Sequence, residues 1–157
     1  MKLALATVVA VGVAIGVSLP AAPPRAAPTA VRVEAEDAPR PTVLERSRGG
    51  HFYAVAEVNG EPIRFVVDTG ASVVALSRAD ARRAGLAFDP GAFAPVGRGA
   101  GGVVRGQEVA IGRVSLDGKA ATGLRGVVLD GSETSLLGQN YLRRLDVSIR
   151  GDTMTLR

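Results

Sequence analysis

Pairs of asparagine or aspartate with glycine divide most of this 157-residue chain into short, β-branched apolar runs. Both central residues of a type I′ turn need positive φ, which Asn-Gly and Asp-Gly readily adopt, so such a pair between two apolar runs predicts a tight β-hairpin. The expected hairpins are residues 51–58 and 61–67 about Asn59-Gly60, 107–116 and 119–129 about Asp117-Gly118, and 146–150 and 153–156 about Gly151-Asp152. Together with an apolar run at residues 73–76, this spacing predicts an all-β domain of seven to nine short strands.

Two short helices are expected within this β framework. Ser77 followed three residues later by Asp80 is typical of a helix start, with Gly85 placed to end the helix after Ala84. A second helical stretch is predicted at residues 139–145. No internal repeat is visible, so the sequence does not indicate a solenoid or a propeller.

The amino terminus is expected to be a targeting element. Residues 3–19 are uncharged and apolar and follow Lys2, which favours a signal anchor in the bacterial cytoplasmic membrane; a cleaved signal peptide is the alternative. Residues 20–48 hold six of the nine prolines and are expected to form a flexible stalk. The predicted division is therefore an anchor at 1–19, a stalk at 20–48 and a folded domain at 49–157 on the periplasmic side.

Composition excludes several kinds of site. The chain has no cysteine, and its one histidine, His51, is interpreted as an ordinary residue at a strand start, so no metal site and no cofactor are expected. The net charge of +4 is mild. The pairs Arg82-Arg83 and Arg143-Arg144 are interpreted as solvated surface, and no nucleic-acid binding is predicted.

Asp68-Thr69-Gly70 is the candidate catalytic motif. It directly follows the apolar run Phe65-Val66-Val67, and a carboxylate beside a buried strand is costly unless it is paired or used. An ordinary turn capped by Asp68 is the structural alternative. The surroundings favour a site, because Ala71-Ser72 follows the glycine and a second element, Leu136-Leu137-Gly138, comes about 70 residues later.

These two elements resemble the retropepsin-like aspartic peptidases, especially single-domain bacterial members with an N-terminal membrane segment. The resemblance covers residues 50–157 and implies an acid-protease half-barrel acting on polypeptides. It implies that Asp68 is the catalytic carboxylate. It further implies supporting roles: bracing of the active-site loops by Thr69, close backbone approach at Gly70 beside Ala71, a hydrogen bond to the carboxylate from Ser72, and structural support from Leu136, Leu137 and Gly138.

One such loop per chain predicts a C2 homodimer, since two carboxylates must share a proton to activate water. Asp117-Gly118 and Asp130-Gly131 lack the intervening threonine or serine and are interpreted as turns. The alternatives are a non-catalytic, membrane-tethered β-domain used for binding or scaffolding, and an aspartate-based phosphoryl-transfer enzyme. A phosphoryl-transfer enzyme of this kind would normally have a second aspartate at position 70, which is a glycine here.

The glycine-rich stretch before the second hairpin is the candidate flap over a substrate, as the resemblance implies. Its residues are Gly97, Arg98, Gly99, Ala100, Gly101 and Gly102. A plain flexible loop is the alternative. The stretch also spells a dinucleotide-binding fingerprint, which would require a strand before it and a helix after it.

Overall fold

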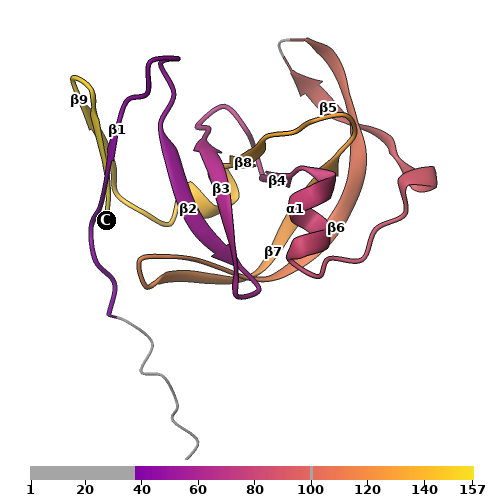
Figure 1. Cartoon of the computed structure of the whole chain (residues 1–157), viewed down its shortest axis with the longest axis horizontal. Coiled ribbons are helices and arrows are strands. Elements are labelled where there is room, and N and C mark those ends of the chain that lie inside the picture. Colours follow the sequence, from indigo (N-terminus) through magenta and orange to yellow (C-terminus); the bar gives the residue numbers. More distant parts are fainter. Residues whose placement is uncertain (1–37, 100) are drawn as a thin grey trace, which may run out of the picture. The chain divides into compact units, whose positions relative to one another are not determined.

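The computed structural model describes residues 38–99 and 101–157, which form ten strands, two short α-helices and one 3₁₀ turn (Figure 1). The elements are β1 (Thr42–Glu45), β2 (Tyr53–Val58), β3 (Glu61–Val67), β4 (Val74–Leu76), α1 (Arg78–Arg83), η1 (Pro90–Ala92), β5 (Ala94–Gly99), β6 (Gly102–Leu116), β7 (Lys119–Leu129), β8 (Ser135–Leu137), α2 (Gln139–Leu142), β9 (Val147–Arg150) and β10 (Thr153–Leu156). The all-β prediction is confirmed.

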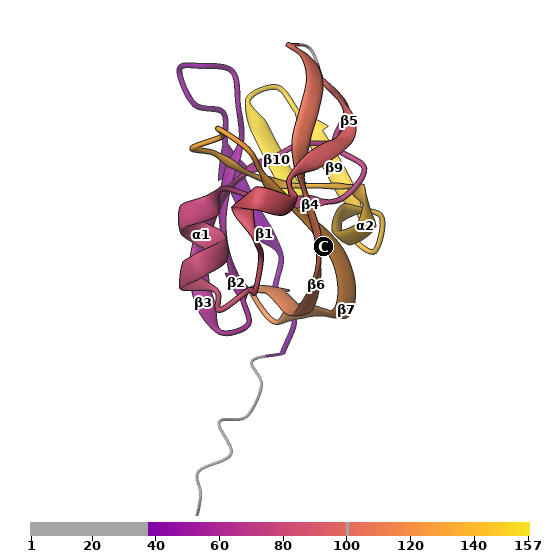
Figure 2. The same cartoon turned by 90° about the vertical axis from the view of Figure 1, so that its right-hand side faces the viewer.

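The strands form two sheets. The larger has the order β2-β3-β8-β4-β7-β6-β5, and an added β2–β6 pairing turns it back on itself into a barrel-like shape (Figures 1 and 2). The smaller sheet, β1-β10-β9, joins the two ends of the described chain. We call it the terminal sheet.

Alternating burial along the strands builds one main core. β2 alternates buried and exposed positions residue by residue, as expected for a sheet with one face inward. The larger residues of this core include Phe65, Ile63 and Tyr141, while small residues such as Ala54 and Ala56 fill the spaces between strands. Aliphatic and alanine side chains thus supply most of the packing in a chain without tryptophan.

The turn chemistry predicted for the first two hairpins is confirmed. Asn59 and Gly60 have φ of 53° and 88°, and Asp117 and Gly118 have φ of 49° and 77°. In the third hairpin, only Gly151 has a positive φ, of 55°. A type I′ turn is therefore not the geometry there.

Helix α1 begins where the sequence predicts, but its cap is completed by a strand. The Ser77 hydroxyl accepts the Asp80 N–H at 3.1 Å. In a reciprocal cap, Asp80 would bond the Ser77 N–H. Instead Ser135 of β8 stands between them, accepting the Ser77 N–H at 3.0 Å and donating to Asp80 at 2.6 Å. Helix α2 ends at Leu142, earlier than expected, because Leu145 N–H bonds the Leu142 carbonyl in a tighter i→i−3 turn.

The folded domain begins earlier than predicted. Residues 42–45 lie within the expected stalk but form β1, which pairs with β10. Thr42 is buried and accepts a hydrogen bond from Lys119 Nζ at 2.9 Å, and Arg40 N–H donates to the Asp117 carbonyl at 3.0 Å. The proline-rich composition of this segment predicted a stalk, whereas the strand forms because it pairs with residues far away in the sequence.

The expected anchor at 1–19, and the stalk up to residue 37, lie outside the described residues. Within residues 38–99 and 101–157, no helix has the length and apolar character needed to cross a membrane.

The glycine-rich stretch is a β-hairpin arm. β5 pairs with the start of β6, with Gly99 opposite Gly102, so β6 begins at Gly102 and not near residue 107. A strand follows the glycines where a dinucleotide fingerprint would need a helix, which contradicts that alternative.

Candidate active site

Asp68 is the first residue beyond the carboxyl end of β3. Its backbone N–H donates to the Leu137 carbonyl at 3.1 Å, extending the parallel β3–β8 ladder by one residue. Because β8 lies between β3 and β4, the connecting residues 68–73 must cross the end of β8. The topology thus puts this carboxylate on a crossing loop with apolar strands behind it. We call residues 68–73 the Asp68 loop.

The Asp68 carboxylate is held by its own loop. Gly70 N–H donates to Oδ1 at 2.8 Å, and Ala71 N–H donates to the Asp68 carbonyl at 3.3 Å. Within the described part of the chain, no other donor bonds the carboxylate, and the residue is only partly buried. One oxygen is therefore fixed while the other is left open to water or to a second molecule.

The tip of the Asp68 loop is exposed. Thr69 and Gly70 are both solvent-accessible. A Cβ at Gly70 would lie 3.2 Å from Asp68 Oδ1, so any side chain there would crowd the carboxylate. The loop therefore offers a backbone surface that another chain could approach closely.

Gly138 lies behind the loop at van der Waals distance. A Cβ there would be 2.2 Å from the Val73 carbonyl oxygen and 2.9 Å from that of Ala71. The next backbone N–H groups cap the loop, since Gln139 N–H donates to Ala71 O at 2.8 Å and Asn140 N–H donates to Ser72 O at 3.1 Å. The missing side chain lets the start of α2 brace the loop.

Two amide side chains add to this bracing, and the sequence analysis gave them no role. Gln139 Nε2 donates to the Thr69 carbonyl at 2.9 Å. Asn140 accepts the Val74 N–H at 2.9 Å and donates to the Arg125 carbonyl at 2.6 Å, joining the loop's exit to β7. The signal in the sequence was two consecutive amides directly after the hydrophobic-hydrophobic-Gly element.

The other predicted support residues lie on both sides of this arrangement. Leu137 is fully buried in the main core, and Leu136 packs with Ala75 in a second apolar cluster. The Ser72 side chain is exposed and, in the described chain, makes no hydrogen bond to Asp68. Its implied role stays a prediction.

Tyr141 fixes α2 to the barrel. It is 1% exposed, and its hydroxyl donates to the Lys119 carbonyl at 2.5 Å. Burial raises the pKa of Tyr141 to about 12. The tyrosine therefore stays protonated, and a hydrogen-bond donor, throughout the neutral range.

The candidate flap projects from the barrel as the β5–β6 arm (Figure 2). A groove of about 630 Å³ runs between β6 and the loop after β7, lined in part by Val103, Val104 and Leu129. Val103 is 57% exposed, which is high for a large apolar residue. Asp68 does not line this groove, and Ala100 lies outside the described residues.

No metal centre is formed by the described residues. Across 38–99 and 101–157, no three histidine, aspartate or glutamate side chains gather closely enough to hold an ion. His51 is exposed just before β2, and its ring meets that of Tyr53 edge-on at 6.5 Å.

Comparison with known proteins assigns the chain to a family. The family model described as aspartyl protease matches residues 54–141. An uncharacterized protein from the cobV 5′ region of Sinorhizobium sp is 33% identical over 136 residues, covering 82% of this chain and 56% of that protein. An uncharacterized protein of Rickettsia prowazekii (strain Madrid E) is 34% identical over 103 residues, covering 65% of this chain and 44% of that protein. The chain thus spans about half the length of the curated relatives it matches.

A solved structure extends the similarity to the fold. The retropepsin-like aspartic protease from Rickettsia conorii superimposes with a TM-score of 0.62 at 33% identity, covering 74% of this chain and 89% of that one. The matched family segment includes both Asp68 and Gly138. This chain therefore belongs to the aspartyl protease family and has the retropepsin-like fold.

Proposed function

We propose that this protein is an aspartic endopeptidase that works as a C2 homodimer, with one Asp68 from each copy. The observation that carries the proposal is the Asp68 carboxylate, hydrogen-bonded at one oxygen and open at the other, on an exposed loop braced from behind by Gly138 and α2. The chain has one such loop, so a pair of carboxylates needs two chains.

The chemistry follows from placing two carboxylates close together. Like charges a few ångströms apart resist double ionisation, so the pair would hold one proton between them, as is general for two-carboxylate peptidases. The ionised carboxylate takes a proton from water, whose oxygen attacks the peptide carbonyl carbon. The protonated carboxylate donates to the carbonyl oxygen. Collapse of the tetrahedral intermediate then breaks the C–N bond: the leaving nitrogen takes the proton that the first carboxylate had gained from water, and a hydroxyl of the intermediate returns a proton to the second carboxylate.

The neighbouring residues have supporting roles in this proposal. Thr69, at the exposed tip, would meet its counterpart and brace the two loops. Ser72 would bond the outer carboxylate oxygen once the dimer closes, and the β5–β6 arm would cover a bound polypeptide. The groove beside Val103 supports a polypeptide substrate, because it offers apolar surface next to the strand edge of the arm.

Asp68→Asn tests the proposal with little change of shape. The asparagine keeps the loop's hydrogen bond to Gly70 N–H but cannot ionise, so cleavage of an unfolded protein should fall by at least about a thousandfold. Circular dichroism and thermal unfolding of the variant should match the wild type. Undiminished cleavage by Asp68→Asn would refute the peptidase, and a folded, inactive wild type would favour the binding-domain alternative.

We also propose that residues 3–19 tether the domain on the periplasmic side of the cytoplasmic membrane, through a shortened stalk that ends before β1. The support is the uncharged apolar run after Lys2. An alkaline phosphatase fused after Arg157 should be active in cells. If alkaline phosphatase is inactive there and only a reporter that works in the cytoplasm is active, the domain lies on the cytoplasmic side.

A further inference from the structure

The outward face of the terminal sheet carries a group of basic and hydroxyl side chains. In the β9–β10 ladder, Ser148 lies opposite Thr155 and Arg150 lies opposite Thr153, so these four side chains leave the same side of the sheet. Arg157 follows Thr155 by two residues and continues the row. The alternate residues of β10, Met154 and Leu156, are buried in the core on the other side.

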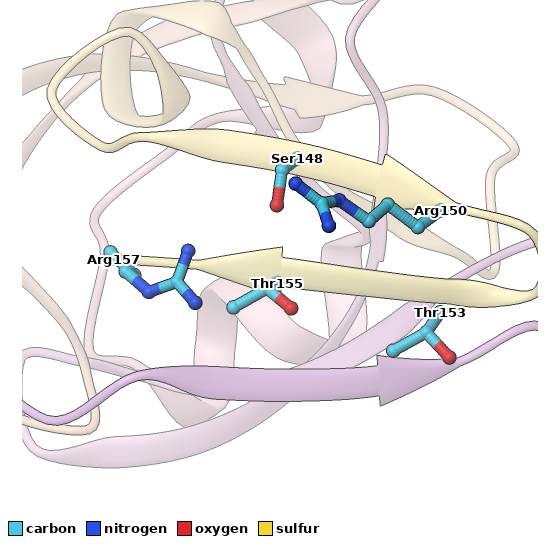
Figure 3. Close-up of a pocket in the computed structure, with 5 residues that line it drawn as sticks. All are labelled: Ser148, Arg150, Thr153, Thr155 and Arg157. Atoms are coloured by element: carbon cyan, nitrogen blue, oxygen red, sulfur yellow. The ribbon is translucent and has the colours of Figure 1, made fainter.

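These side chains line a shallow cavity of about 340 Å³ (Figure 3). The view shows both guanidinium groups turned toward the middle of the face, where Ser148 and Thr155 lie. We call these five lining residues the basic face: Ser148, Arg150, Thr153, Thr155 and Arg157.

Among the described residues, the two arginines of the basic face have no acidic side chain as a partner. In the described residues, neither Arg150 nor Arg157 has a side-chain ion pair or hydrogen bond. Asp146 lies across the ladder from Arg157, bonded to it backbone to backbone, without a side-chain ion pair. Glu45 lies opposite Thr153 on the same side of the sheet and accepts a hydrogen bond from the Thr153 hydroxyl at 3.4 Å, without an ion pair to either arginine.

We propose that the basic face binds a phosphate group. Guanidinium groups bind tetrahedral oxyanions through paired N–H donors, and the Ser148 and Thr155 hydroxyls, which have no hydrogen-bond partner among the described residues, can donate to the remaining oxygens. A phosphate group offers more acceptor oxygens than a carboxylate, and a phosphate monoester also carries more charge, so a phosphate matches two cations and two hydroxyls better. The ligand is either a soluble phosphate ester or the headgroup of an anionic phospholipid.

This inference stands apart from the proposed peptidase activity, because the basic face is formed by β9, β10 and Arg157 and contains no residue of the Asp68 loop. The test uses the full chain in a neutral detergent and titrates it with glycerol phosphate at constant ionic strength, following the backbone amide signals of β9 and β10 by NMR. A second arm measures co-sedimentation with phosphatidylglycerol and phosphatidylcholine vesicles.

The test variant is Arg150→Gln with Arg157→Gln, and the control is Arg48→Gln with Arg143→Gln. All four arginines are exposed, and the control removes the same total charge. The test variant should weaken phosphate binding by about tenfold or more, and the control should leave it within about twofold.

The two arms distinguish the sources of phosphate. Loss of the glycerol phosphate response in the test variant alone, with unchanged sedimentation, identifies a soluble ester. A lipid headgroup is identified if the test variant alone loses the excess of sedimentation with phosphatidylglycerol over that with phosphatidylcholine. Residues 3–19 are the same in every variant, so their contribution to sedimentation does not differ between test and control. If test and control variants behave alike in both arms, the basic face is not a phosphate site.

Discussion

Gly138 lacks a side chain at the point where the Asp68 loop crosses closest to α2. A methyl group there would lie 2.2 Å from the Val73 carbonyl oxygen, which is backbone and cannot rotate away. Gly138→Ala should therefore lower the free energy of unfolding by about 1–3 kcal/mol, as overpacked sites do. Chemical denaturation measures the change. The control is Gly97→Ala, because a Cβ there meets nothing within 4 Å; equal losses in both variants would contradict the close approach at Gly138.

Tyr141 links stability to alkaline pH. Burial raises its pKa from 10.0 to about 12, so the folded state holds a proton that the unfolded state has lost within that range. Its contribution is complete below pH 10 and disappears as the pH rises toward 12. Burial lowers the pKa of Lys119 below 10.5, which acts in the opposite sense and only below that pH. Between pH 10.5 and 12, the wild type should lose stability more steeply than Tyr141→Phe. Parallel unfolding curves for the two proteins in this interval would show that Tyr141 is not the group responsible.

At the scale of elements, four segments meet around Arg78 at the base of the flap. Its guanidinium group forms an ion pair with Asp130 and lies 4.9 Å from the centre of the Phe93 ring. Asp130 N–H in turn donates to the Arg105 carbonyl at 2.9 Å, and the Arg105 side chain donates to the Phe93 carbonyl at 2.5 Å. The ion pair therefore joins α1 to the loop after β7, and the neighbouring hydrogen bonds continue from there to β6 and to Phe93, the residue before β5.

Breaking that ion pair should loosen the arm. We expect Asp130→Asn to lower the local stability of the arm by about 1 kcal/mol, which would speed hydrogen exchange at the amides of β5 and of the first residues of β6 by roughly fivefold. Glu108→Gln is the control, since its pair with Arg125 is highly exposed and should matter little. An arm whose exchange is unchanged by Asp130→Asn is held by its strand pairing alone.

The elements that the sequence predicted are those with local causes. Asn59-Gly60 and Asp117-Gly118 determine their own turns, and the strands beside them follow from alternation. β1, β5 and β8 were missed because none of them has a local signal. Residues 42–45 become a strand through pairing with β10 and contacts with Lys119, and residues 94–99 do so by pairing with β6 across a register shift between Pro95 and Gly97.

The same limit applies to the candidate site. Asp68 and Gly138 could be found in the sequence because each lies in a short motif. The roles of Gln139 and Asn140 depend on β8 entering between β3 and β4, which brings residues about 70 positions apart into hydrogen-bonding distance. The sequence Gln139-Asn140 does not itself show which backbone carbonyl each side chain will bond.

At the scale of the whole molecule, the proposed chemistry is concentration-dependent. Each chain presents one Asp68 loop, with Thr69 and Gly70 exposed. A membrane tether would confine chains to a surface and raise their effective concentration, so pairing that is weak in solution could still occur there. Solution measurements on the full chain in detergent should therefore reveal an assembly equilibrium.

Specific activity should rise with protein concentration and level off above the dimer dissociation constant, because only paired chains hold two carboxylates. Sedimentation over the same range should show the dimer appearing with the activity. Mixing equal amounts of wild type and Asp68→Asn above that constant should roughly halve the activity per wild-type chain, since half of those chains then lie in mixed dimers with one working carboxylate. The Arg48→Gln/Arg143→Gln protein, mixed in the same way, should leave activity per Asp68 unchanged. A monomer with constant specific activity, unaffected by Asp68→Asn, would overturn the shared site.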